Sequence, residues 1–309
     1  MAALVQRIRA RAASLPTFDI PFLLILLLLL SYGLIMLFSA GYAVALYRRG
    51  DAYTYIRPQL LFAALGVLAM YAASLVDYHV WHRLAWPMLG ISLLLLTIVL
   101  FMPEYNGCKR WIVLPGLGTL QPSEIAKFSI VLVFSHIISL NHDRMKSFST
   151  GVVPFALILG VVTVLMLLEP HLSGTLLILS IGAVLMFVGG TGLHWFGLAG
   201  LGLGNSRQKY LYVPEPQNDF IFSILCEELG FIGAALVVAL FLLLLLRGMS
   251  IAVRARDKFG ALLVVGFVVQ VTLQAILNMA VVTNTIPNTG ISLPFFSVSY
   301  THLTLPTIA

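Results

Sequence analysis

Glu124 and Lys127 are the first residues whose types and spacing could do chemistry, because they place two opposite charges in an apolar run. They follow Pro122, a residue that suits the first turn of a helix. Their i, i+3 spacing puts them on one helix face, within reach of each other. Ionisable residues at membrane depth are costly and are functional candidates by default. The pair predicts either an internal ion pair that locks two helices or the charged wall of a cavity facing the outer leaflet.

The segment 202–220 carries the richest set of polar groups. Its glycines could let backbone amides approach an anion, and Arg207 and Lys209 could hold phosphates as charges. Asp219 stands where this loop enters the next apolar run. Partial desolvation there could raise the pKa of its carboxyl group and make it a general base. The simpler alternative is that Asn218 or Asp219 caps the helix that follows.

Three further polar groups carry a weaker signal. Glu169 and His171 fall at a turn between two apolar runs, and no second ligand stands at metal spacing from that histidine. Residues 284–294 hold two prolines, which favours a stiff polar rim at the outer surface. Two adjacent acids, Glu227 and Glu228, lie one to two turns inside a predicted span. We expect at least one of them to pair with a buried base or to stay protonated.

The composition places these polar groups in a membrane protein. Of the 309 residues, 60% are hydrophobic and only 10% are charged, against about 25% charged in ordinary soluble domains. Mean hydropathy is +1.00. These values exclude a soluble globular domain, a disordered protein and a nucleic-acid-binding module. The net charge of +6 is therefore interpreted as an excess of Lys and Arg on cytoplasmic loops. Two cysteines cannot make a disulfide framework.

The apolar runs predict an all-α polytopic membrane protein, because they are continuous rather than alternating as in a β-barrel. The first run is too long for a signal-peptide core, and we expect it to remain as a mature helix. The eight predicted spans are 20–47, 59–76, 84–102, 122–140, 152–168, 172–190, 220–246 and 259–282.

The distribution of basic residues predicts which loops lie inside. The N-terminal tail, with three arginines and no acid before Asp19, belongs inside, and so does the most basic loop, 247–258. Arg110 then lies on an outer loop, where it suits an anionic ligand. One more crossing is needed before residue 205, and only 191–204 is available. As a helix that segment would rise ~21 Å against a core of ~30 Å, so we expect a helix to be missing there.

From the residues alone, the chain is a polytopic membrane protein with an outward-facing polar and charged cavity. Its expected ligand is anionic and lipid-like. Two classes of function stay open at this point. One is an enzyme that acts on a lipid-linked substrate, and the other is a transporter or flippase for such a lipid.

Four long segments resemble the SEDS family of bacterial cell-wall polymerases, and within it the FtsW/SpoVE branch. The resemblance covers about residues 15–297 and implies a ten-helix bundle, of which about eight helices are recognisable here. The segments are NGCKRWIVLPGLGTLQPSEIAKF at 106–128, EPHLSGT at 169–175, GLGLGNSRQKYLYVPEPQNDFIFSILCEELGFIG at 200–233 and NTIPNTGISLPFFS at 284–297.

The resemblance implies a reaction and roles for individual residues. The family polymerises lipid II, the undecaprenyl-pyrophosphate-linked disaccharide-pentapeptide, into glycan strands at the outer face of the cytoplasmic membrane. Its essential aspartate matches Asp219, which would take the proton from the acceptor sugar 4-hydroxyl. The predicted substrate-binding residues are Arg110, Glu124, Lys127, Glu169, His171, Arg207, Lys209, Gln217 and Thr289.

The resemblance also implies partners, a cofactor and a place in the cell. The expected partners are lipid II, a class B penicillin-binding protein with transpeptidase activity and other membrane proteins of the division complex, with no nucleic acid. A divalent cation, magnesium or manganese, is expected at the leaving group, and no organic cofactor. The expected location is the bacterial inner membrane at the division septum. The competing functions are a lipid II flippase and a non-catalytic scaffold of the division complex.

The sequence departs from the family pattern at two places. After residues 192–197 the family continues through a seventh helix and a long outer loop. Compared with this pattern, we expect some fifty residues to be missing here near 198–202. After Ser297 the family continues into a tenth helix, whereas 298–309 reads as a non-native tail. The predicted organisation is a cytoplasmic N-terminal tail at 1–19, a transmembrane domain at 20–297 and the non-native C-terminal tail at 298–309.

Overall fold

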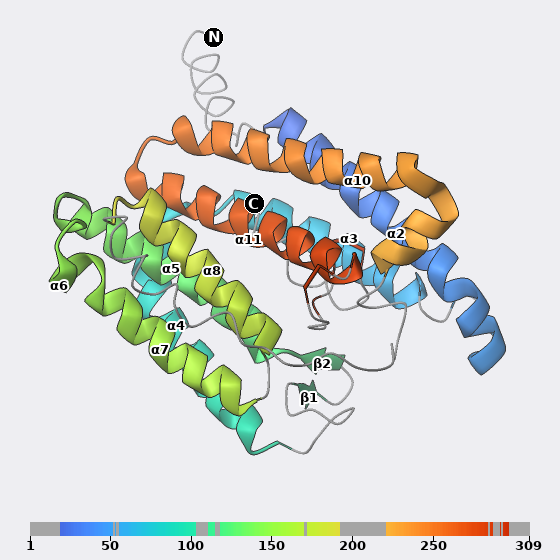
Figure 1. The fold of residues 1–309 in the computed structure, drawn as a ribbon, viewed down its shortest axis with the longest axis horizontal. Coiled ribbons are helices and arrows are strands. Elements are labelled where there is room, and N and C mark those ends of the chain that lie inside the picture. The colour runs from blue at the N-terminus through green and yellow to red at the C-terminus, as the bar shows by residue number, and fades with distance from the viewer. Residues whose placement is uncertain are drawn as a thin grey trace, which may run out of the picture.

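The chain forms a bundle of long apolar helices in the computed structural model (Figure 1). The structure describes residues 19–51, 53, 56–102, 111–114, 118–169, 172–191, 221–283, 285–286, 291 and 293–296. The long helices are α2 (Ile20–Arg49), α3 (Ile56–Ser74), α4 (His79–Leu100), α5 (Pro122–Asn141), α7 (Val153–Leu168), α8 (Leu172–Val188), α10 (Ile221–Val253) and α11 (Lys258–Val282). A short helix, α6 (Phe148–Gly151), and a 3-10 turn (His142–Arg144) join α5 to α7.

All eight predicted spans are confirmed as helices. Seven helical segments are long and apolar enough to cross a membrane, and α8 contributes a shorter apolar stretch, Gly174–Val188. The starts differ most at α4, which begins at His79 rather than at residue 84. The added residues include His79, His82 and Arg83, and the Asp77 carboxylate accepts a hydrogen bond from the His79 backbone N–H at 2.9 Å. Polar residues at a helix start interrupt the apolar run, so hydropathy alone places that start too late.

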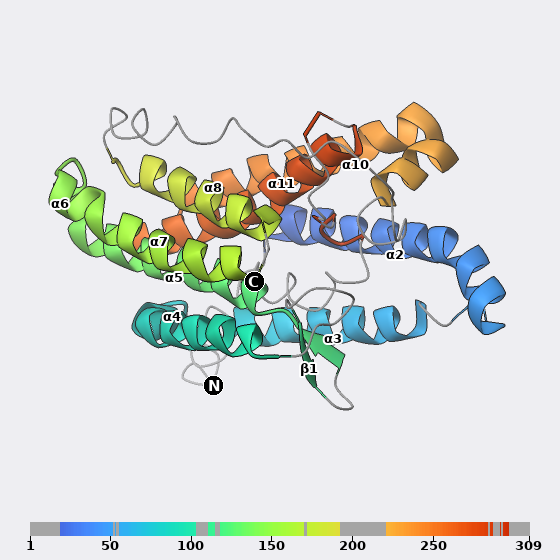
Figure 2. The ribbon, with the colours of Figure 1, turned by 60° about the horizontal axis from the view of Figure 1, so that its bottom comes forward.

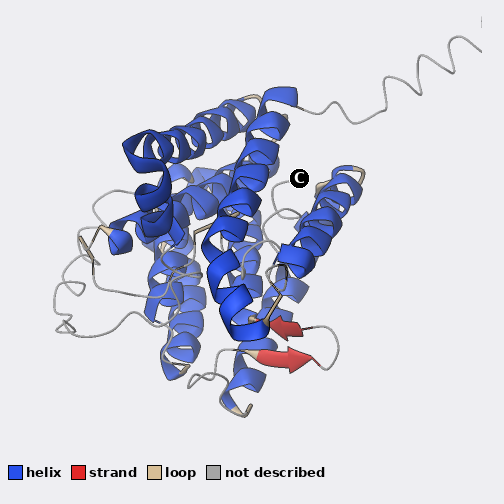
Figure 3. Cartoon of the chain, turned by 90° about the vertical axis from the view of Figure 1, so that its right-hand side faces the viewer, coloured by secondary structure: helices blue, strands red, loops and turns tan. Residues whose placement is uncertain are grey.

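A small β-hairpin was not predicted from the sequence. Strands β1 (Ile112–Leu114) and β2 (Gly118–Leu120) pair antiparallel in the loop that precedes α5. The hairpin lies at one edge of the bundle (Figure 3). Strands of three residues are too short to show an alternating pattern in the sequence.

Helix α11 lies between α8 and α10 (Figure 2) and contributes to two apolar clusters, of which the first also contains the buried residues of α5. One cluster packs residues of α4, α5, α7, α8 and the first half of α11. The other packs α2, α3 and α10 against the second half of α11. The spanning segments of α5 and α11 are 67% and 56% buried, against 22–33% for the other spans. Polar side chains on these two helices therefore face protein rather than lipid.

Residues 291 and 293–296 pack inside the bundle, which corrects the last part of the predicted outer polar rim at 284–294, whereas Thr285 is exposed. Ile291, Leu293 and Phe296 are buried. The backbone of Phe295 passes so close to α2 that a Cβ on Gly33 would clash with the Phe295 carbonyl oxygen. Phe295 has a φ of 68°, a region that non-glycine residues rarely adopt. Burial of the apolar side chains in this segment lowers the free energy of the fold, which exposure in a surface loop would not do.

Polar contacts identify the inner end of the bundle, and the helix directions then define the outer end. At one end Arg247 of α10 binds Asp19, the N-cap of α2, through two hydrogen bonds of 2.9 and 2.7 Å. This is the end that carries the basic loop, so the positive-inside rule assigns it to the inner side. At the same end, the Thr191 hydroxyl donates to the carbonyl of Gly151, next to the start of α7. Because α10 runs away from this end, Thr191 and Ile221 lie at opposite ends of the bundle.

The Asp19–Arg247 contact predicts a pH-dependent contribution to stability. The hydrogen bond from Arg247, helped by the backbone N–H of Phe22, holds the pKa of Asp19 below its usual 3.8. A lowered pKa stabilises the fold above the unfolded pKa, and this stabilisation is lost as pH falls through the folded pKa. We expect Asp19→Asn to lower the melting temperature in detergent by about 2 °C at pH 7 and by less at pH 3, below the unfolded pKa.

The matched control is Asp51→Asn at the other end of α2. Asp51 forms an exposed ion pair with Arg57 at 3.3 Å, and such pairs contribute little. A loss for Asp19→Asn that is equally large at pH 3 and at pH 7 would contradict the assignment to the ionised carboxylate.

Candidate functional site

The best-supported site is a buried charged network at the start of α5, at the outer end of the bundle. The Lys127 ammonium lies 2.7 Å from a carboxylate oxygen of Glu124 and donates a hydrogen bond of 3.2 Å to the side-chain carbonyl of Gln274 on α11. Only 3% of the Lys127 side chain and 13% of the Glu124 side chain are exposed. The predicted proximity of Glu124 and Lys127 is therefore observed, and the pair also joins α5 to α11.

The local sequence explains why the charges sit at this position. Pro122 begins α5, and Glu124 falls in its first turn, where the helix dipole stabilises a negative charge. Lys127 follows one turn later, which directs its long side chain along the same face toward Glu124. A carboxylate oxygen and an amide oxygen contact its ammonium, which offsets part of the cost of burying this group in a membrane protein.

Three amide side chains on α11 extend this network, and the sequence reasoning missed them. Gln270, Gln274 and Asn278 follow one another at four-residue spacing, and all are at least 95% buried. Asn278 donates a hydrogen bond of 2.6 Å to the carbonyl of Ile291, which fixes the segment that folds back into the bundle. The signal was present in the sequence. Amides at i, i+4 and i+8 in an apolar helix share one face, and in a membrane that face must turn inward.

Two more buried polar residues lie at the same end of the bundle. Glu169, which follows the last residue of α7, is fully buried, and Thr175 in the first turn of α8 is 4% exposed. Helix α8 packs against both α5 and α11. The outer end thus collects carboxylates, an ammonium, amides and a hydroxyl between helices, a set that can bind and orient a polar, charged ligand.

The structure brings together only part of the predicted site. Glu124, Lys127 and Glu169 are described at the outer end, as set out above. The side chains of Glu227 and Glu228 lie outside the described residues. The remaining predicted site residues lie there too, and they are Arg110, His171, Arg207, Lys209, Gln217, Asp219 and Thr289. Within the described part of the chain, no group of three or more His, Cys, Asp or Glu side chains could hold a metal ion.

Comparison with known proteins identifies a family over almost the whole chain. The family described as "Cell cycle protein" (FtsW/RodA/SpoVE) matches residues 20–199 and 192–305. The chain is 32% identical to a probable peptidoglycan glycosyltransferase FtsW from Trichlorobacter lovleyi, over 92% of this chain and 88% of that protein. It is 35% identical to stage V sporulation protein E of Bacillus subtilis, over 94% of each chain.

Solved structures share the fold. The rod shape determining protein RodA of Thermus thermophilus matches with a TM-score of 0.70 and 28% identity, over 90% of this chain and 92% of that chain. A chain from a study of how a peptidoglycan synthase complex coordinates polymerization and crosslinking matches with a TM-score of 0.72 and 27% identity. That match covers 90% of this chain and 94% of the other. The all-α bundle predicted from the sequence is therefore confirmed.

The network predicts non-additive effects when its charges are removed. Lys127→Met leaves the Glu124 carboxylate without its cation in a buried site, and we expect a loss of about 3–5 kcal/mol in the free energy of unfolding. Glu124→Gln combined with Lys127→Met removes both charges and should be less destabilising than Lys127→Met alone. Thermal unfolding of the purified protein in detergent measures both effects.

The control for the lysine substitution is Lys146→Met, which removes an exposed lysine at the inner end and should change the melting temperature little. Glu124→Gln is also measured alone. If the losses in stability of Lys127→Met and Glu124→Gln simply add in the double variant, Glu124 and Lys127 are not coupled and the interpretation fails.

Proposed function

The chain belongs to the FtsW/RodA/SpoVE family of cell cycle proteins, and we propose that it polymerises lipid II with Asp219 as the general base. It is a multi-pass membrane protein, and its curated relatives carry the name peptidoglycan glycosyltransferase. The chain is accordingly a glycosyltransferase of peptidoglycan synthesis. Lipid II as its substrate and the roles of single residues belong to the proposal.

The buried network at the outer end carries this proposal. A lysine and a carboxylate buried between two central helices cost free energy in a membrane, so a purely structural role would not require them. Lys127, Glu124 and Gln274 are instead held in fixed positions, as a site for a charged lipid-linked substrate requires. Asp219 comes two residues before Ile221, the first residue of α10, and α10 starts at this same end.

The proposed reaction transfers one glycan chain to the next lipid-linked sugar. The 4-hydroxyl oxygen of the acceptor sugar attacks the anomeric carbon of the donor, and its proton passes to the carboxylate of Asp219. A C–O bond forms at the anomeric carbon while the bond to the pyrophosphate-lipid breaks. Arg207 and Lys209 supply positive charge for the leaving pyrophosphate. Lys127 already pairs with Glu124, so its role is to orient the substrate.

A magnesium or manganese ion at the pyrophosphate remains a proposal. The chemistry that such an ion supplies is neutralisation of the leaving group's charge. The described residues provide no ligand cluster for it, and the reaction above does not depend on it.

The proposed setting is the division septum of a bacterial inner membrane, with a class B penicillin-binding protein as partner. A structural relative comes from a complex that coordinates polymerization and crosslinking, which supports pairing with a crosslinking enzyme. The matching family is described as cell cycle proteins, and one curated relative is named stage V sporulation protein E, which supports a role in septal or spore wall synthesis.

We further propose that the chain lacks about fifty residues that its relatives contain, including the seventh helix. The match to Trichlorobacter FtsW runs over 338 positions but includes 92% of this chain, about 284 residues, so about 54 positions of the relative have no counterpart. The family match is also divided in two, with the break at 192–199. The segment 298–309 lies outside the described residues, and the family match extends to residue 305, which counts against a non-native tail that begins at 298.

Replacing Asp219 tests the enzymatic proposal. We expect Asp219→Asn to reduce glycan synthesis from lipid II by at least 10²-fold, the lower range for loss of a general base, while lipid II binding changes little. The measurement is gel separation of glycan products made by the purified protein, with lipid II binding measured in parallel.

The matched control is Asp51→Asn, which removes a carboxylate from the same outer end and should leave synthesis unchanged. Normal polymerisation by Asp219→Asn would contradict the role as base. A variant that polymerises nothing but still moves lipid II across vesicle membranes at the normal rate would indicate a flippase. Complementation of a cell lacking the native protein by the same variant would indicate a scaffold.

The location of residue 219 gives an independent test. With Cys108 and Cys226 replaced and a single cysteine placed at Asn218, we expect an impermeant maleimide to label intact spheroplasts. A cysteine at Ser147 on the inner side is the control and should react only after lysis. If the cysteine at 218 also reacts only after lysis, this chain cannot present Asp219 to an outer-leaflet substrate.

A further inference from the structure

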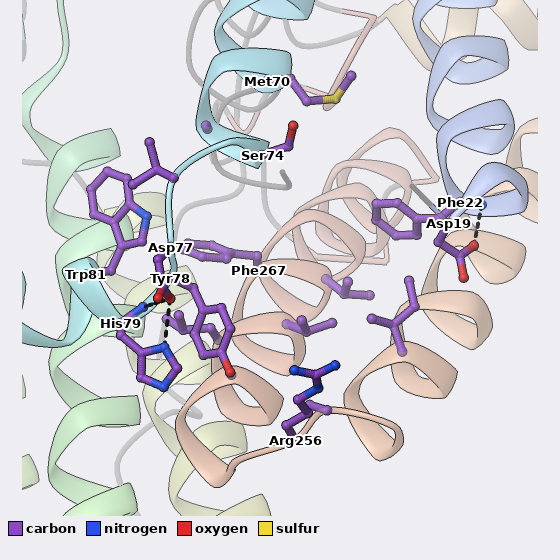
Figure 4. Close-up of a pocket in the computed structure, with 18 of the residues that line it drawn as sticks. Asp19, Phe22, Met70, Ser74, Asp77, Tyr78, His79, Trp81, Arg256 and Phe267 are labelled. Atoms are coloured by element: carbon purple, nitrogen blue, oxygen red, sulfur yellow. Dashed lines mark hydrogen bonds and ion pairs between the residues drawn. The ribbon is translucent and has the colours of Figure 1, made fainter. Parts of the chain in front are cut away.

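A large cavity opens at the inner end of the bundle, opposite the proposed active site (Figure 4). It has a volume of about 1040 Å³ and lies between α2, α5, the turn from α3 to α4 and the turn from α10 to α11. Ligand pockets typically have roughly 300–1,000 Å³. The cavity is therefore large enough for a substantial ligand, and no part of the proposed reaction uses it.

The interior of this cavity is apolar. Its deep wall includes Leu26, Met70, Leu132 and the rings of Phe128 and Phe267. These two rings stack with their centroids 5.4 Å apart and their planes inclined by 15°. Such a lining favours hydrocarbon over water.

The acidic residues at the mouth already have partners. Asp19 binds Arg247 at 2.7 Å, and Asp77 lies 2.7 Å from the ring of His79. Asp257 accepts hydrogen bonds from the Tyr78 hydroxyl at 2.5 Å and from the backbone N–H of Gly260 at 3.2 Å. The carboxylates therefore hold the inner turns together and are not available to an incoming cation.

The arginines at the mouth differ from these acids. Arg254 and Arg256 line the cavity and are exposed. In the part of the chain that the structure describes, neither guanidinium forms an ion pair. Arg256 lies at the opposite end of the cavity from Met70 (Figure 4). A guanidinium binds phosphate through two parallel hydrogen bonds, so the mouth is suited to a phosphate and the interior to hydrocarbon chains.

We propose that this cavity binds an anionic phospholipid of the inner leaflet, with acyl chains in the interior and the phosphate between Arg254 and Arg256. Basic pockets between transmembrane helices on the cytoplasmic side are suited to anionic head groups. A free phosphate ion would leave the apolar interior unfilled, whereas a bilayer lipid fills both parts. The site lies at the opposite end of the bundle from the Glu124–Lys127 network, so the inference does not depend on the proposed function.

Trp81 provides a direct probe, because it lines the cavity and packs edge-on against Phe128 at 5.5 Å. In the full chain with Trp86, Trp111 and Trp195 replaced by Phe, brominated lipids should quench its fluorescence at short range. We expect brominated phosphatidylglycerol in detergent micelles to quench Trp81 at a lower mole fraction than brominated phosphatidylcholine. Inorganic phosphate at 10-fold excess over the lipid should not reverse the quenching.

Two variants separate the head group from the chains. Arg254→Gln with Arg256→Gln should raise the mole fraction of phosphatidylglycerol needed for half-quenching by about 25-fold, from about fivefold per arginine near a charged surface, and leave phosphatidylcholine unchanged. Ala73→Phe, which adds a ring to the cavity lining, should reduce quenching by both lipids. The matched control is Arg144→Gln with Lys146→Gln, which removes two exposed charges from another inner loop and should change nothing.

The remaining outcomes contradict the proposal. Equal quenching by the two lipids means that no anionic site exists. An equal effect of the control pair means that the preference comes from the general charge of the inner surface. Displacement of the lipid by inorganic phosphate means that the arginines hold a free anion.

Discussion

The contact on which the rest of the bundle depends is the one between Lys127 on α5 and Gln274 on α11. A lysine in the middle of a membrane protein is tolerated only when its charge is compensated, and here Glu124 supplies the opposite charge while Gln274 supplies an amide oxygen. This requirement fixes α5 against α11, the two most buried spans. The other helices then pack on either side of this pair. Asn278, one turn further along α11, uses the same face to hold Ile291, so the network also positions the segment that closes the outer end.

The two ends of the bundle separate two kinds of chemistry. The outer end holds buried charges and amides, whereas the inner end holds paired acids around an apolar cavity with two arginines at its mouth. One helix contributes to both ends. Phe128, whose ring stacks on Phe267 at the wall of the inner cavity, directly follows Lys127 of the polar network on α5. Because successive residues of a helix point in different directions, α5 presents a polar side chain to the network and an aromatic ring to the cavity.

The sequence predicts the helices well because a bilayer demands long apolar runs and backbone hydrogen bonds satisfied within each helix. It also predicts the contact between Glu124 and Lys127, because a spacing of three residues on one helix is local information. It does not predict Gln274 as their partner, 147 residues away, because α5 and α11 meet only in the packed bundle. The burial of Leu293 and Phe295 was missed for a related reason. Their neighbours are polar and rich in turn residues, and only the close approach to Gly33 shows that this segment packs inside.

The inferred gap near residue 198 affects the two parts of the proposed site differently. Lys127 lies before it and Gln274 after it, and their hydrogen bond is present, so the central network forms without the seventh helix. Asp219 depends directly on the gap. Thr191 is held at the inner end by Gly151, while α10 begins at the outer end. In a ten-helix relative, a seventh helix and a long loop would join these two ends. Here the same distance must be covered by residues 192–220 alone, which also carry Arg207, Lys209 and Asp219. The buried network is thus independent of the gap, whereas the position of the carboxylate proposed as the general base depends on residues 192–220.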